Sequence, residues 1–136
     1  MLLLVFAVII ESGRLMWAFQ NVNTGVRDAT RYLARITRED ICVTGGTVAN
    51  RQSEMETIVR ETIGGDTIFP SKIVIDSVSP VLSCVVGSYR VSPAPVVRVT
   101  ARVTIDFPFS GLFSFGGQSL GTLSKIVEDQ SRVYGT

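Results

Sequence analysis

Residues 1–36 read MLLLVFAVIIESGRLMWAFQNVNTGVRDATRYLARI, and this stretch is the most informative part of the sequence. The first ten residues are uninterrupted apolar side chains, and residues 15–19 continue the apolar run after the polar residues 11–14. No break separates the two halves of the stretch. It predicts one helix about 54 Å long, at about 1.5 Å per residue.

The first half of this helix is apolar on every face. The run is shorter than the roughly 20 residues that a bilayer-spanning helix needs. It also lacks the basic start and the small-residue cleavage site of a signal peptide. A buried core helix is the alternative, but a helix that is apolar all round needs a large core or lipid around it. A chain of 136 residues leaves little room for such a core. We therefore expect residues 1–19 to be buried in lipid or in the core of a filament.

The second half of the helix is amphipathic. Apolar residues recur at alternating steps of four and three, at Leu15, Phe19, Val22, Val26, Ala29, Leu33 and Ile36. Polar residues occupy the other faces, so this half should rest on a globular domain or on a partner helix. Gly25 within it is either a weak point or a place of close helix approach, and the first is commoner.

Glu11 and Arg14 are the charged residues inside the apolar part. Their i, i+3 spacing places them on one helix face, where they partly neutralise each other. An isolated ion in lipid is costly, and pairing or a position near the headgroups lowers that cost. The pair is either a membrane-boundary pair or a docking charge that sets the helix register between subunits. Spacing alone slightly favours the first.

Residues 50–63 (NRQSEMETIVRETI) predict a short second helix. Ser53 or Asn50 could cap its start, and Gly64-Gly65 would end it. Its inner face would consist of Met55, Ile58, Val59 and Ile63.

The remainder of the chain predicts strands. The four candidates are residues 72–78, 82–91, 96–107 and 120–134. The third is the clearest, because one face would carry only apolar residues while arginine and threonine fill the other. These apolar residues are Val97, Val99, Ala101, Val103 and Ile105. The expected fold is α+β, with a sheet of about four antiparallel strands on the second half of the first helix. We divide the chain into the anchoring helix 1–36 and an α+β domain 37–136.

The composition argues against several classes of function. Lys and Arg total 13 against 12 Asp and Glu, a net charge of +1, so nothing favours nucleic-acid binding. The chain contains no histidine, which removes Ser-His-Asp and Cys-His catalysis and His-ligated zinc. No phosphate-binding loop or catalytic constellation is found. We expect no enzyme activity, no metal, no cofactor and no small-molecule substrate.

Cys42 and Cys84 are the two cysteines of the chain. Without histidine and without CxxC spacing they make a poor metal site and a poor redox motif. A disulfide is the stronger interpretation if the domain lies outside the cytosol, which the membrane-like N-terminal segment allows. It would close a loop of about 42 residues and contribute about 4 kcal/mol in the chain-entropy model. Two unpaired buried thiols remain the alternative.

Four phenylalanines crowd the segment DFPFSGLFSF, at Phe107, Phe109, Phe113 and Phe115. They could form an exposed patch for a partner. They could equally fold inward as core, and the usual burial of large aromatics favours this second interpretation.

The stretch LLLVFAVIIESGRLMWAFQNVNTGVRDATRYLAR resembles the N-terminal signature of the TadE-like minor pilins (pseudopilins) of tight-adherence, Flp-type pili. That pattern has an apolar leucine-rich run, then Glu, a small or aromatic residue and Gly-Arg, here Ile10 to Arg14. An amphipathic continuation follows, here with Arg27-Asp28-Ala29-Thr30-Arg31-Tyr32. Paired cysteines and a Val/Arg/Thr-rich strand that ends in an aromatic-Pro segment also agree with the family. The family's basic leader, processing glycine and early glutamate are missing, so we expect the natural polypeptide to carry residues before Met1.

The resemblance implies a minor pilin-like subunit that primes or caps a filament for surface adhesion. Its implied partners are the major Flp-type pilin, other TadE-, TadF- and TadG-like minor pilins, a pilus assembly platform and the lipid of the bacterial inner membrane. Its domain would be extracytoplasmic, and the assembled subunit would reach the cell surface. The alternative function is a membrane-tethered extracytoplasmic binding module that uses the segment Phe107–Phe115 as its partner surface.

Overall fold

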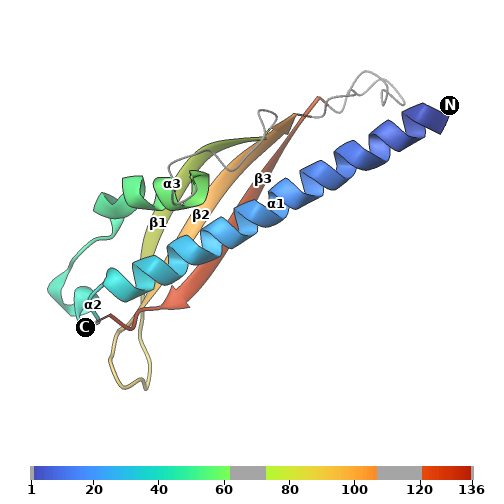
Figure 1. Ribbon diagram of the computed structural model, residues 1–136. Helices are drawn as coiled ribbons and strands as arrows, with labels where there is room; N and C mark the ends of the chain where they lie inside the picture. The colour runs from blue at the N-terminus through green and yellow to red at the C-terminus, as the bar shows by residue number, and fades with distance from the viewer. Residues whose placement is uncertain (1, 62–72, 107–120, 136) are drawn as a thin grey trace.

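The structure, a computed structural model, describes residues 2–61, 73–106 and 121–135. In this part of the chain, helices lie on one face of a three-stranded antiparallel sheet (Figure 1). The fold is therefore α+β, as the sequence predicts. The elements are α1 (Leu2–Ile36), α2 (Ile41–Thr44), the 3₁₀ turn η1 (Ala49–Arg51), α3 (Gln52–Arg60), β1 (Ile73–Val85), β2 (Ala94–Asp106) and β3 (Thr122–Arg132).

The single long helix is confirmed. α1 runs unbroken over 35 residues, and its N-terminal part extends past the sheet (Figure 1). The predicted amphipathic stripe is the face that packs on the sheet. Val22, Val26, Ala29 and Leu33 are fully buried, while Leu15, Phe19 and Ile36 are partly buried against the same core.

The central strand β2 forms the floor of the core. The strand order is β1-β2-β3, so both neighbours pair with β2. All five apolar residues predicted for one face of this strand are buried, and its Arg and Thr residues alternate with them. α1 packs over β2 and β3, while α3 packs over β1 and against α1. On the opposite face, which no helix of the described residues covers, the side chains of β2 are partly buried or exposed.

The structure differs from the predicted four strands. Residues 73–78 and 82–85 of the first two candidates belong to one strand, β1, which continues through Pro80. Residues 86–91 of the second candidate are not part of a strand. Ser79-Pro80, a pair typical of turns, separates the two candidates in the sequence. Pro80 pairs opposite Val99, and among the described residues β1 is an edge strand, where a residue without an N–H is tolerated. Within the described residues the sheet therefore has three strands.

A β-bulge explains why β1 does not alternate regularly. The register shifts between Ile75 and Ser77, which leaves Asp76 without a partner residue on β2. Ile73 and Ile75 are buried before the shift and Val78 is buried after it. Because of the extra residue, the inward-facing positions change from odd to even residue numbers, and apolar side chains face the core on both sides of the bulge.

The second helix is shorter than residues 50–63. α3 begins at Gln52, and Met55 and Val59 form its buried face. Neither Ser53 nor Asn50 caps it, because the turn η1 leads directly into α3 and the cap position falls at Arg51 without a side-chain cap bond. Ile63 and Gly64-Gly65 lie outside the described residues.

Backbone contacts hold α1 to the rest of the domain. Gly25 lies against α3, where an added Cβ would stand 3.3 Å from the Cα and from the carbonyl oxygen of Val59. Gly25 therefore marks a close approach of two helices. At the far end the amide N–H of Tyr134 donates to the carbonyl of Ala34 at 3.2 Å, and Gly135 forms a parallel bridge with Arg38. The C-terminal end of the chain thus lies beside the end of α1.

Candidate functional site: the apolar end of α1

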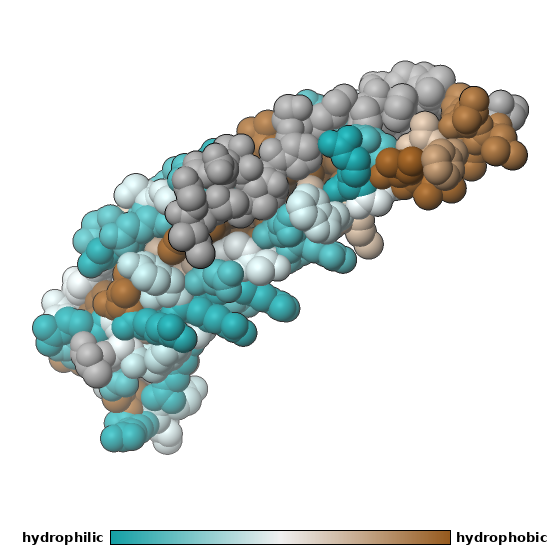
Figure 2. All heavy atoms as spheres, in the orientation of Figure 1, coloured by the Kyte–Doolittle hydropathy of each residue, from teal (hydrophilic) through white to brown (hydrophobic). Residues whose placement is uncertain are grey.

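The most unusual surface of the described residues is the N-terminal part of α1. From Leu2 to Trp17, which we call the apolar end of α1, large apolar side chains are exposed on several faces. Leu2 is 84% exposed and Trp17 is 60% exposed. Figure 2 shows apolar residues gathered at this end, while hydrophilic residues cover much of the rest of the visible face. The exposed members are Leu2, Leu3, Leu4, Val5, Phe6, Ile9, Ile10, Met16 and Trp17.

This surface suits lipid or closely packed helices. α1 is long enough and apolar enough to cross a membrane. Exposed apolar area costs about 25 cal/mol per Å² in water, so such a surface marks an interaction site. A helix of this kind indicates membrane anchoring.

Glu11 and Arg14 form an ion pair within the apolar end. Arg14 Nη1 lies 3.4 Å from Glu11 Oε2. The Glu11 side chain is 21% exposed and that of Arg14 is 62% exposed, because Glu11 lies on the helix face that continues into the buried stripe. The Ser12 hydroxyl donates to the carbonyl of Val8 at 2.8 Å, so its hydrogen-bond donor is paired within the helix. The local pair reduces the cost of placing either charge in a low-dielectric environment.

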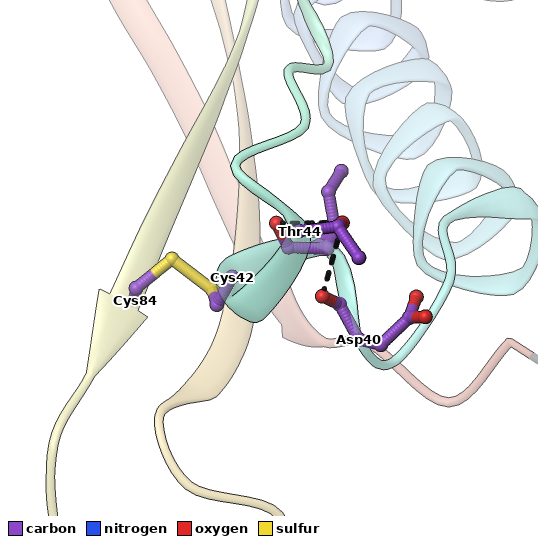
Figure 3. The surroundings of a disulfide bond; sticks show 5 residues. Asp40, Cys42, Thr44 and Cys84 are labelled. Carbon is purple, nitrogen blue, oxygen red and sulfur yellow. Dashed lines mark hydrogen bonds between the residues drawn. A yellow bond between two sulfur atoms is a disulfide. The ribbon is translucent and has the colours of Figure 1, made fainter.

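Cys42 and Cys84 form a disulfide. It joins α2 to the end of β1 with a Cα–Cα distance of 5.8 Å (Figure 3). Both cysteines of the chain are paired in this bond, so the alternative of two free thiols is excluded. Cys84 is exposed and Cys42 is partly buried. Because disulfides persist in oxidising compartments, this bond indicates an extracytoplasmic domain.

The short helix α2 is anchored around Asp40. The Thr44 hydroxyl donates to the carbonyls of Asp40 and Ile41 at 3.2 and 3.4 Å (Figure 3). Arg38 donates two hydrogen bonds to the Asp40 carboxylate, at 3.0 and 2.8 Å. These bonds from Arg38 lower the pKa of Asp40, and the same contact raises the pKa of Arg38.

Surface recesses are the other candidate sites in the described residues. The described residues contain no group of three or more acidic, Cys or His side chains that could hold a metal ion. One surface recess of about 250 Å³ lies between the end of α1 and η1, and it contains the Arg38–Asp40 pair. Another, of about 340 Å³, is lined by Glu39, Arg90 and Arg132.

The predicted partner surface is the Phe-rich segment. Phe107, Phe109, Phe113 and Phe115 all lie outside the described residues. Val74 and Leu123, exposed apolar residues at the end of the sheet nearest the apolar end of α1, are not among the predicted site residues. In the sequence, only their positions near the starts of two predicted strands could have indicated this surface. A single apolar residue near a strand start is too common to identify a site.

Comparison with known proteins adds no assignment. No family model, no curated protein and no solved structure matches the chain.

Proposed function

We propose that this chain is a non-enzymatic, membrane-anchored structural subunit that works by packing, a minor pilin-like protein of the tight-adherence type. The observation that carries the proposal is the division of α1 into an exposed apolar end and a half buried against the sheet. Lipid and neighbouring helices both keep apolar side chains from water. The same surface can therefore anchor the subunit before assembly and pack into a filament core afterwards.

The disulfide supports an extracytoplasmic position for the domain. In this proposal the subunit resides in the bacterial inner membrane with its domain outside the cytosol, and it reaches the cell surface within a pilus. By resemblance its partners are the major Flp-type pilin, further TadE-, TadF- and TadG-like minor pilins and the assembly platform. Priming or capping the filament, in support of surface adhesion, is the proposed role.

Cell fractionation tests the proposal, because it shows whether the chain is in the filaments or only in the membrane. Filaments sheared from intact cells should contain the chain, in amounts well below those of the major pilin. The rival function, a membrane-tethered binding module, predicts that all of the chain stays in the detergent-extracted membrane. Absence from the sheared filaments, with the chain intact in the membrane, would refute the pilin-like role.

Glu11 is proposed to set helix register against a neighbouring subunit, because an unpaired buried charge penalises wrong registers. Glu11→Leu should reduce the number of filaments several-fold while the disulfide still forms and the domain still folds. Filament counts by electron microscopy measure the effect, and Glu56→Leu on α3 is the matched control. Normal filament numbers in Glu11→Leu would exclude the register role.

A further inference from the structure

α1 and β3 lie side by side and run in the same direction. The Thr30 hydroxyl is 3.4 Å from the carbonyl oxygen of Asp129, and the Tyr134 amide donates to the Ala34 carbonyl at 3.2 Å. These two contacts relate each position along the strand to a position along the helix.

The beginning of β3 is level with the apolar end of α1. From Asp129 back to Leu123 the strand covers about 20 Å, at about 3.3 Å per residue. The same distance corresponds to about 13 residues of helix at about 1.5 Å each, which leads from Thr30 to Trp17. Leu15 and Phe19 pack partly against the core on either side of this level. Figure 1 likewise shows the end of the sheet alongside α1, short of its N-terminus.

Trp17 marks where lipid should end. Met16 and Trp17 are 65% and 60% exposed, whereas Ala18, the next residue, is buried against the domain. Tryptophan is enriched at the boundary between lipid and water because its ring is apolar and its N–H is polar. If α1 anchors the chain with Trp17 at this boundary, Leu123 lies at the boundary too.

The residues at this end of the sheet suit a lipid surface. Leu123 and Val74 are exposed apolar side chains at the starts of β3 and β1. Lys125 is exposed two residues after Leu123, where its ammonium can reach lipid phosphates. Asp106, paired with Thr122 at the last rung, is exposed and charged, so the contact involves the headgroup layer and stops short of the hydrocarbon.

We propose that this end of the sheet, defined by Val74, Leu123 and Lys125, rests in the headgroup layer of the membrane that α1 enters. The bilayer is the occupant because this surface is level with the exposed apolar surface of α1. The inference rests on the proposed membrane anchoring. It adds a second contact, which fixes the orientation of the domain relative to the lipid before assembly.

The first test uses Trp17, the only tryptophan of the chain, without any substitution. The full chain is reconstituted into phosphatidylcholine vesicles. Brominated lipids should quench Trp17 fluorescence strongly, and aqueous iodide should quench it several-fold less than it quenches free tryptophan. Full access of iodide to Trp17 would place the boundary nearer the N-terminus and overturn the proposal.

The second test measures depth on the sheet itself. A fluorescent label is attached to Leu123→Cys, with Gln130→Cys further along the same strand as the matched control and Val5→Cys as the anchor reference. Lipids with a nitroxide near the headgroup should quench the Leu123→Cys label several-fold more than the Gln130→Cys label. The native cysteines are closed in a disulfide and do not react.

The outcomes separate this inference from the anchoring it rests on. Equal quenching at positions 123 and 130, with Val5→Cys in lipid, would overturn the sheet contact and leave the anchor intact. A Val5→Cys label that remains in water would overturn the membrane anchoring, and the sheet contact with it.

Discussion

At the scale of single residues, two glycines set how closely the chain can pack around α1. Gly25 brings α1 against the backbone of Val59 on α3. Gly135 lies so close to the carbonyls of Arg35 and Thr37 that a Cβ there would overlap backbone atoms. In both places a neighbouring main chain occupies the space of the missing side chain, so the contact cannot yield by moving a flexible side chain.

Gly25→Val should destabilise the domain, because the new side chain would meet the backbone of Val59. Overpacking of this kind typically costs about 1–3 kcal/mol. Thermal or denaturant unfolding in detergent, followed by circular dichroism, measures the loss. Gly13→Val is the matched control on the same helix, since a Cβ at Gly13 meets nothing within 4 Å. Equal stability of the two variants would contradict the close approach.

The Arg38–Asp40 contact predicts a small dependence of stability on pH. Hydrogen bonds from Arg38 hold the pKa of Asp40 below its ordinary value of 3.8 in the folded state. A lowered carboxyl pKa stabilises the fold above the unfolded pKa, and this stabilisation is lost as the pH falls through the folded pKa. NMR titration should find the Asp40 pKa below 3.8, and Arg38→Gln should raise it. Both side chains are exposed, so the effect should weaken with salt.

At the scale of elements, the disulfide joins two pieces that otherwise share few contacts. α2 has four residues and none of them is fully buried, but Ile41 packs partly against the core. The bond to Cys84 holds it at the end of β1, which is also where the sheet ends. The disulfide therefore adds a covalent link to β1 to the core contact of Ile41 and the hydrogen bonds around Asp40.

Replacing both Cys42 and Cys84 by serine should lower the free energy of unfolding by about 4 kcal/mol, the loop-closure value for a separation of 42 residues. Denaturant unfolding of the oxidised protein and of the double variant gives the difference. Reduction of the native protein should give a similar loss without prior unfolding, because Cys84 is exposed. Stoichiometric alkylation of both cysteines in the unreduced protein would contradict the bond.

Regular periodicity made the longest elements predictable from the sequence. Apolar residues recur at steps of three and four along α1, and they alternate strictly with polar residues along β2. Each pattern predicts which side chains face the core, and both predictions are confirmed. β1 could not be predicted as one strand, because Pro80 and the bulge at Asp76 interrupt the local pattern while pairing with β2 continues. The predicted start of the second helix was wrong, because residues that can cap a helix are common in sequences. The turn η1 occupies residues 49–51, so α3 begins at Gln52 with Arg51 at the cap position. The Phe107–Phe115 surface remains a prediction.

At the scale of the whole molecule, α1 belongs to two environments. Its second half is part of the core, where Val22, Val26 and Leu33 are fully buried. Its apolar end projects beyond that core (Figure 1). The change in environment occurs near Ala18, within one continuous helix.

A chain that begins at Leu15 should therefore remain folded and stay in solution without detergent. A chain that begins at Thr37 should fail to fold, because it loses the helix that covers β2 and β3. Circular dichroism, a cooperative unfolding transition and sedimentation distinguish the two. A folded chain from Thr37 would show that the sheet does not need α1.

The parallel arrangement of α1 and β3 has a consequence for any force applied along the helix. Tension applied at the N-terminal end of α1 and resisted by the domain pulls the helix along its own axis. The stripe from Val22 to Leu33 and the backbone contacts near Ala34 are then loaded in shear, so they must break together instead of one after another. The contacts that bury the core therefore also resist a force that pulls α1 along its axis.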